Sequence, residues 1–219
     1  MSIARIVLTV FAGLVCLFPA GSWLFPAGAW AGAPTDQIKG TIDQVIRTVE
    51  DPALRQASMA QERRAAIRKQ AEALFDFTET AKRALGRHWP ELSDVQQREF
   101  VSLFTDLLER SYIGRLEQYG GERIVYAGDS IEGDTATVRT KFITKQGTEI
   151  PVDYRLLRRG DRWLAYDVFV EGISLVSNYR NQFNKVVQTE SYQSLVQKLR
   201  AKETEPAASA APRERRTTP

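Results

Sequence analysis

The spacing of apolar residues changes in the middle of the chain, and this change narrows the range of folds. Before about residue 120, apolar side chains recur every three or four positions, which is typical of amphipathic helices. From Arg123 onward, apolar and polar residues alternate, which is typical of strands with one buried face. Helices followed by consecutive strands predict an α+β domain.

The alternating half is expected to form a four-stranded antiparallel sheet. The strands are expected at residues 123–131, 134–144, 149–158 and 162–171, with Gly133, Gly147 and Gly160 in the turns. Short turns of this kind join neighbouring antiparallel strands. In the third strand Ile150, Val152, Tyr154 and Leu156 share one face, and Asp153 and Arg155 share the other. One face of the sheet therefore needs a cover.

Helix signals divide the rest of the chain. The first helix carries an apolar stripe from Ile38 to Val49 and ends at Pro52. A capping box of Ser58 and Gln61 predicts the start of a second helix. A third is expected to start at Asp76 and Glu79 and to end near Gly86, and a fourth to start at Ser93 and Gln96. Gly114 is expected to kink or break the fourth helix. Two C-terminal helices, with stripes from Ile173 to Val187 and from Tyr192 to Leu199, are expected to cover the sheet.

The chain begins with a segment that favours export. Residues 6–33 contain no charged side chain, and Ala29 and Ala31 present the small-x-small pattern that signal peptidase accepts. We therefore expect a signal peptide at residues 1–31, one domain at residues 32–202 and a disordered tail at residues 203–219. An uncleaved membrane anchor is the alternative for the N-terminal segment, because the apolar run is long enough to span a bilayer.

Composition argues against several classes of function. The chain has 30 basic and 27 acidic residues, which argues against a nucleic-acid-binding protein. The lone cysteine, Cys16, lies in the expected signal peptide, and with one histidine, His88, no metal or cofactor site is expected. No catalytic motif occurs, although Asp153 or Asp167 could act as a general base. We favour the simpler reading that Asp167 accepts structural hydrogen bonds.

Several segments resemble one family. They are the strand-to-helix segment from Tyr166 to Phe183, the run Phe75-Asp76-Phe77-Thr78, the run from Ala84 to Trp89, and the residues from Leu92 to Phe100. In order and spacing the chain is similar to the MlaC-type, or toluene-tolerance, family of periplasmic phospholipid-binding proteins. The resemblance covers roughly Asp36 to Leu199.

The resemblance implies a curved sheet and helices with a lipid cavity between them. The implied wall, transferred to positions of this chain, comprises Phe104, Leu108, Tyr112, Val152, Tyr154, Tyr166, Val168, Val170, Val176, Tyr179 and Phe183. The implied function is non-enzymatic transport of phospholipid between the inner and outer membranes. The implied partners are an inner-membrane ABC transporter complex with a mammalian-cell-entry domain subunit, and an outer-membrane lipoprotein–porin complex.

Three alternatives stay open at this point. A related carrier from hopanoid-producing bacteria would carry a hopanoid. An enzyme on a similar cone-shaped fold would use Asp153 or Asp167 as its base. A membrane-tethered assembly factor would retain the N-terminal segment.

Two basic features of the sequence have two interpretations each. The run Arg63, Arg64, Arg68 and Lys69 forms either a solvated helix face or a membrane contact. Arg180 is either a structural pin or part of the pocket rim.

Overall fold

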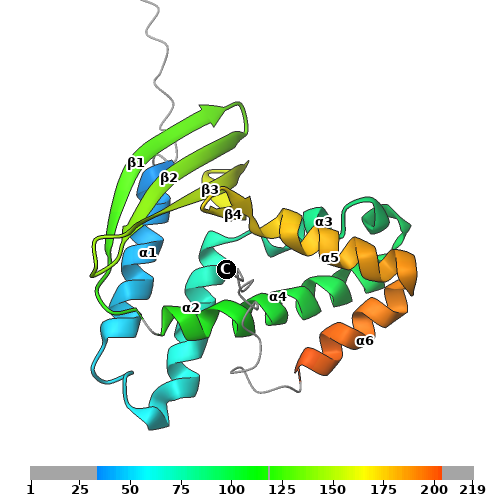
Figure 1. Cartoon of the computed structure of the whole chain (residues 1–219), viewed down its shortest axis with the longest axis horizontal. Helices are drawn as coiled ribbons and strands as arrows, with labels where there is room; N and C mark the ends of the chain where they lie inside the picture. The colour runs from blue at the N-terminus through cyan, green and yellow to red at the C-terminus, as the bar shows by residue number, and fades with distance from the viewer. Residues whose placement is uncertain (1–33, 118, 204–219) are drawn as a thin grey trace, which may run out of the picture.

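The computed structural model describes residues 34–117 and 119–203. The expected signal peptide, its cleavage site and most of the expected tail lie outside these residues. Within them, no helix is long and apolar enough to cross a membrane. The described chain forms an α+β fold, as the sequence predicts (Figure 1).

The first half of the chain is helical. Its elements are α1 (Pro34–Glu50), a 3₁₀ turn η1 (Ala57–Met59), α2 (Ala60–Leu74), α3 (Phe77–Leu85), a second 3₁₀ helix η2 (Gly86–Glu91) and α4 (Asp94–Leu116). The predicted caps of α3 and α4 are confirmed. The backbone N–H of Glu79 donates to Asp76 Oδ1 over 2.9 Å, and the backbone N–H of Ser93 donates to Gln96 Oε1 over 2.9 Å.

Two details of these helices differ from the prediction. Ser58 does not cap α2, because the chain enters this helix through η1 and the backbone N–H of Ala60 bonds the carbonyl of Ala57 instead. Gly114 does not break α4, which continues to Leu116. A single glycine costs a helix only about 1 kcal/mol, which tertiary packing readily outweighs.

The second half forms one antiparallel sheet with strands in chain order. The strands are β1 (Arg123–Glu132), β2 (Thr135–Ile143), β3 (Glu149–Arg159), β4 (Arg162–Val170) and a short β5 (Ile173–Ser174). The meander is as predicted, with β5 as an additional edge strand. Ile173 therefore belongs to β5, where it is 68% exposed, and not to the stripe of the next helix.

Two β-bulges interrupt the sheet register. One lies between Tyr126 and Gly128 in β1, and the other shifts the pairing of β3 with β4 after Arg155. Side chains alternate along a strand with a period of two, so Val168 and Ala165 would normally lie on opposite faces. The second bulge places them on the same face, because Val168 pairs with Tyr154 and Ala165 with Leu156. Most of β4 can thus present apolar side chains to the inside of the curved sheet.

Helix α1 provides the main cover of the buried sheet face. It is fixed to β1 by Thr35, whose backbone N–H and hydroxyl donate to Asp129 Oδ2 over 3.0 and 2.6 Å. Gln37 Oε1 accepts a hydrogen bond of 2.6 Å from the backbone N–H of Trp163 in β4. Ile38, fully buried, packs with the inner residues of the sheet.

The C-terminal helices have a different place from the predicted one. Helices α5 (Leu175–Thr189) and α6 (Tyr192–Glu203) lie beside α3 and α4, away from most of the sheet (Figure 1). Their apolar residues pack against Phe100 and Phe104 of α4. Only the first part of α5 contacts β4. The sequence correctly predicts that their apolar stripes are buried, but these stripes pack mainly against other helices and not against the sheet.

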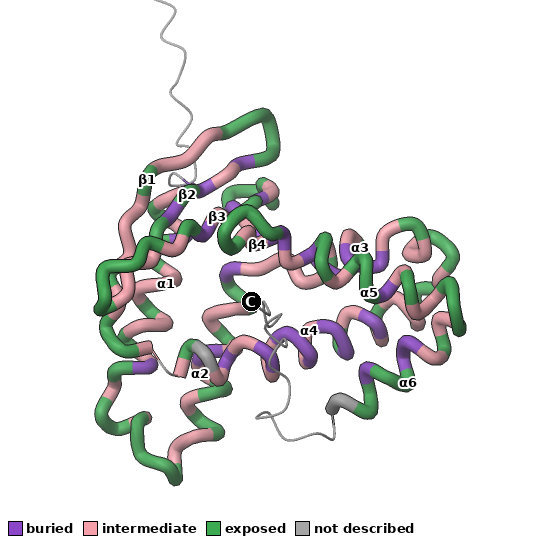
Figure 2. Tube along the Cα trace, viewed as in Figure 1, coloured by how far each residue is buried: buried purple, intermediate pink, exposed green. Residues whose placement is uncertain are grey.

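The buried apolar residues form three separate clusters. A helical cluster joins α3, α4, α5 and α6, a sheet cluster joins α1 with β2, β3 and β4, and a small third cluster comprises Val49, Ile67 and Ile113. Figure 2 shows that α1 and α2 are mostly half-buried or exposed, with few buried positions. The half-buried apolar residues between the clusters indicate that the interior is not uniformly filled.

Asp167 connects β4 to the start of α5. Its Oδ1 accepts hydrogen bonds from the backbone N–H groups of Val168 and Val176 over 2.8 and 3.0 Å. Its Oδ2 accepts one from the Ser174 hydroxyl over 2.6 Å. Ser174 Oγ in turn caps α5 by accepting from the backbone N–H of Ser177. The structural reading of Asp167 is thus confirmed.

We predict that Asp167→Asn lowers the free energy of unfolding by about 1–3 kcal/mol, because it removes the charge from a buried acceptor with three donors. Chemical denaturation of both proteins measures the difference. Asp153→Asn is the matched control, since the Asp153 side chain is only half-buried and makes no hydrogen bond or ion pair with the described residues. We expect a change of less than about 0.5 kcal/mol there. Equal effects at the two positions would contradict the role given to Asp167.

Candidate functional site

A cavity of about 390 Å³ lies between the sheet and helices α1, α2 and α4. Its volume falls within the range of about 300–1,000 Å³ that is typical of small-molecule sites. All three apolar clusters contribute to its wall, with Leu108 from the helical cluster, Leu74 from the sheet cluster and Val49 from the third. The cavity is therefore the space that the three clusters leave between them.

Most of the lining side chains are aliphatic or aromatic. The apolar lining residues of the helices and of the residues that follow them are Ile42, Val45, Ile46, Val49, Ile67, Ala71, Leu74, Phe75, Phe77, Leu108, Tyr112, Ile113, Leu116, Tyr119 and Leu175. Those of the sheet are Ile124, Phe142, Tyr154, Tyr166, Val168, Val170 and Ile173. Leu116, Val170 and Ile173 are also exposed, so the cavity reaches the molecular surface beside them.

The structure places six of the eleven expected wall residues at this cavity. They are Leu108, Tyr112, Tyr154, Tyr166, Val168 and Val170. The other five lie outside its lining: Phe104, Val152, Val176, Tyr179 and Phe183. Contact of any of the eleven with lipid stays a prediction.

The five outlying residues belong to packed core. Phe104 meets Tyr179 and Phe183 edge to face, with ring centroids 5.0 and 5.1 Å apart. Val176 is buried in the same cluster, and Val152 is buried among the inner residues of the sheet. Close-packed side chains of this kind leave no room for a ligand.

Sequence reasoning missed the contribution of α1 and α2 to the cavity. Four residues of α1, Ile42, Val45, Ile46 and Val49, lie on the wall. Three of them are only half-buried, whereas Ile38 in the preceding turn is fully buried. Their spacing predicted an amphipathic helix, but spacing cannot distinguish a stripe that packs against core from one that faces a cavity. The family resemblance pointed to the sheet, α4 and α5 instead.

An ion pair between two helices borders the cavity. Arg68 of α2 and Glu109 of α4 both line it, and Arg68 Nη1 lies 2.9 Å from Glu109 Oε2. Arg68 is also paired with Asp106 and Glu72. Burial lowers the pKa of Arg68, but the neighbouring carboxylates outweigh this effect and raise it. Arg68 therefore stays charged and joins α2 to α4.

The basic run on α2 is mainly an ion-paired helix face. Arg63 and Arg64 both pair with Glu117, at 2.7 and 3.5 Å, and Arg68 has the three partners described above. Within the described residues this supports the structural reading of the run over a free basic surface. The pairs tie α2 to the end of α4, across the wall of the cavity.

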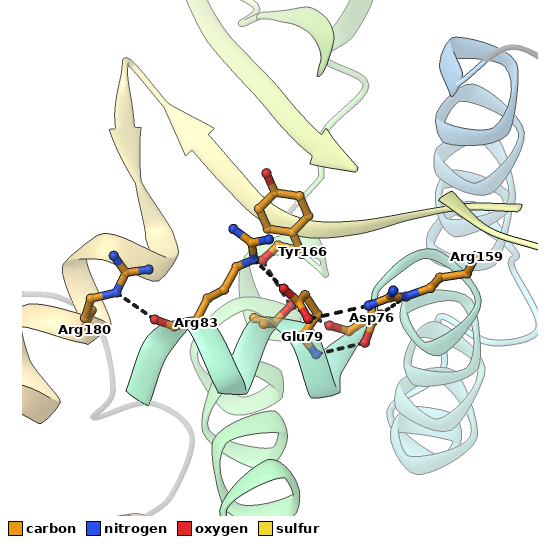
Figure 3. Close-up of polar contacts among 7 residues, drawn as sticks. Asp76, Glu79, Arg83, Arg159, Tyr166 and Arg180 are labelled. Atoms are coloured by element: carbon orange, nitrogen blue, oxygen red, sulfur yellow. Dashed lines mark hydrogen bonds and ion pairs between the residues drawn. The ribbon is translucent and has the colours of Figure 1, made fainter. Parts of the chain in front are cut away.

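A polar network on α3 holds Tyr166 at the wall (Figure 3). Arg83 Nε donates to Glu79 Oε1 over 2.7 Å, and the Arg83 guanidinium lies 4.0 Å from the centre of the Tyr166 ring. Arg159 of β3 pairs with Asp76 over 2.8 Å and with Glu79 over 3.5 Å. The network joins β3, α3 and β4, and the Arg83 guanidinium packs on the face of the Tyr166 ring.

Arg180 of α5 has a structural contact with α3. Its Nε donates to the backbone carbonyl of Arg83 over 2.7 Å, in the last turn of α3 (Figure 3). It does not line the cavity. Arg180 therefore pins α5 to α3, which supports the structural reading over a place at the pocket rim.

The residues considered for catalysis do not form a reactive group. Asp167 lines the cavity, but both of its oxygens accept structural hydrogen bonds. Asp153 lies outside the lining. His88 Nε2 lies 3.0 Å from Asn184 Oδ1, away from the cavity. Among the described residues there is no group of three or more His, Cys, Asp or Glu that could hold a metal ion.

Comparison with known proteins gives consistent matches. The curated intermembrane phospholipid transport system binding protein MlaC of Haemophilus influenzae is 22% identical over 129 residues, which span 57% of this chain and 60% of that protein. The structure of a phospholipid-binding protein from Ralstonia solanacearum, in complex with a phospholipid, is similar with a TM-score of 0.70 and 27% identity. The structural match covers 78% of this chain and 97% of the Ralstonia chain.

The sequence profile described as MlaC protein matches residues 39–201, which is most of the chain and nearly all of the described fold. This range includes every strand and nearly all of the helices that enclose the cavity. On the profile match, the shared fold and the curated relative, the chain belongs to the MlaC family.

Proposed function

We propose that this protein is a periplasmic carrier that holds the acyl chains of a phospholipid in its cavity and moves the lipid between the inner and outer membranes. The observation that carries this proposal is the largely apolar wall between the sheet and helices α1, α2 and α4. The names of the Haemophilus and Ralstonia relatives, one for phospholipid transport and one for phospholipid binding, support the choice of ligand.

The physical demand on such a carrier is to hide acyl chains from water. Each buried methylene contributes about 0.8 kcal/mol, so two chains of roughly fifteen methylenes represent on the order of 20 kcal/mol. An apolar wall supplies this free energy without directional contacts. Discrimination between chain lengths should consequently be weak.

The proposed place and partners rest on the family resemblance. The expected signal peptide would deliver the protein to the periplasm. An inner-membrane ABC transporter complex with a mammalian-cell-entry domain subunit, and an outer-membrane lipoprotein–porin complex, would exchange lipid with it. The exposed and paired lining residues Val170 and Ile173 mark a place where lipid would enter.

Two alternatives differ in cargo and in chemistry. A hopanoid would satisfy the same apolar wall, so cavity chemistry alone does not separate it from a phospholipid. An enzyme is less well supported, because Asp167 is occupied by structural hydrogen bonds and Asp153 lies outside the cavity lining. We therefore propose a carrier that makes and breaks no bond in its cargo.

The direct test of the function is native mass spectrometry of the protein purified from the periplasm, followed by lipid extraction. We expect a chain that begins at Gly32 and carries a co-purifying phospholipid. A hopanoid mass would select the related carrier. A lipid-free protein that also takes up no phospholipid from vesicles would contradict the carrier function.

Substitution of Val168 by Trp tests the cavity. Val168 lines the cavity, so the larger side chain should take space from acyl chains and lower the bound phospholipid per protein. We expect the delipidated variant to lose less than about 1 kcal/mol of stability, because the indole fills open volume.

Val138→Trp is the matched control. Val138 and Val168 both pair with Tyr154, but Val138 is fully buried and lies outside the lining. Overpacking there should destabilise the delipidated protein by about 1–3 kcal/mol. Delipidated samples are needed because bound lipid itself stabilises the folded state. Full lipid occupancy in Val168→Trp, together with a loss of stability as large as in Val138→Trp, would show that Val168 lies in packed core.

A further inference from the structure

Two tyrosine hydroxyls on the inner face of the sheet lack a hydrogen-bond partner within the described residues. The Tyr126 hydroxyl is buried without a partner. Tyr154 is only 7% exposed, and no hydrogen bond joins its hydroxyl to any described residue. Native proteins leave few buried hydroxyls unpaired, because such a group has lost its bonds to water without replacement.

Only one of these two hydroxyl-bearing residues lines the cavity. Tyr154 is part of the wall, whereas Tyr126 packs against the sheet cluster outside the lining. Burial raises the pKa of both tyrosines, that of Tyr126 to about 12, and the nearby Tyr126 phenol raises the pKa of Tyr154 further. Both hydroxyls therefore keep their protons at neutral pH and are available as donors.

The position of Tyr154 along the strands limits what it can meet. Tyr154 pairs with Val168, and the next inward-facing pair is Val152 with Val170. Val170 lines the cavity and is 45% exposed, and it pairs in turn with the exposed Ile173. At about 3.4 Å per residue, Tyr154 lies roughly 7 Å inward from the place where the wall reaches the surface.

We propose that the Tyr154 hydroxyl donates a hydrogen bond to an ester carbonyl of the bound phospholipid. This inference rests on the proposed function. In a diacyl phospholipid the ester carbonyls are the hydrogen-bond acceptors between the head group and the apolar chains, which matches a buried hydroxyl without a described protein partner a short distance inside a largely apolar wall. The contact would fix how deeply the lipid enters without reading the head group.

The test compares diacyl and diether phosphatidylcholine of equal chain length. Diether lipids lack both carbonyls and are otherwise similar. Wild-type protein should bind the diacyl lipid about 3- to 10-fold more tightly, which is the range for one neutral hydrogen bond. Tyr154→Phe should bind the two lipids with nearly equal affinity, and the melting temperature of its delipidated form should not fall.

Tyr126→Phe is the matched control. It removes an unpaired buried hydroxyl outside the lining, so the diacyl preference should stay at the wild-type value. The same ratio of affinities in all three proteins would overturn the contact, and would indicate that Tyr154 bonds water.

A third lipid, phosphatidylcholine with a hydroxylated chain, is measured in the same way. If Tyr154→Phe changes only the affinity for that lipid, the acceptor is a chain oxygen and the ester assignment is overturned. Failure of wild-type protein to bind any of these lipids would overturn the proposed function as well as the contact.

Discussion

The inner face of the sheet is apolar and must be covered, yet its cover leaves a space. Helix α1 is fixed at its start by Thr35 and Gln37, and Ile38 packs tightly there. Further along, Ile42, Val45 and Ile46 face the cavity and are only half-buried. A normal interior would close this gap, since close packing adds dispersion contacts. The connections between the other elements of the fold keep this gap open.

Several rigid connections surround the cavity. Arg63, Arg64 and Arg68 tie α2 to α4 on one side. The network around Asp76 and Glu79 ties α3 to the sheet on another, and Asp167 fixes the junction of β4 with α5. The aromatic contacts of Phe104 join α4 to α5, and that of Phe100 with Tyr192 joins α4 to α6. With the polar and helical parts stabilised independently, the apolar wall can stay open to a ligand.

The sequence predicted the elements better than their arrangement. Strand boundaries followed from alternation and glycine turns, and the caps at Asp76 and Ser93 followed from side-chain chemistry. The predicted placement of α5 and α6 over the sheet was partly wrong. An apolar stripe shows that a helix face is buried, but it does not identify the surface that the face packs against. The family resemblance likewise assigned Val176 and Phe183 to the cavity wall and did not assign Ile42 and Val45 to it. The bulge that turns Val168 inward has no clear sequence signal.

The central claim is that acyl chains occupy the space beside α1 and not the helical block. Nuclear Overhauser effects between a bound phospholipid and methyl-labelled protein test it most directly. We expect contacts from acyl methylenes to the methyl groups of Ile42, Val45 and Ile67, which line the cavity, and none to Val196 or Leu199, which are buried among the helices. Contacts to Val196 and Leu199 without any to Ile42 or Val45 would contradict it.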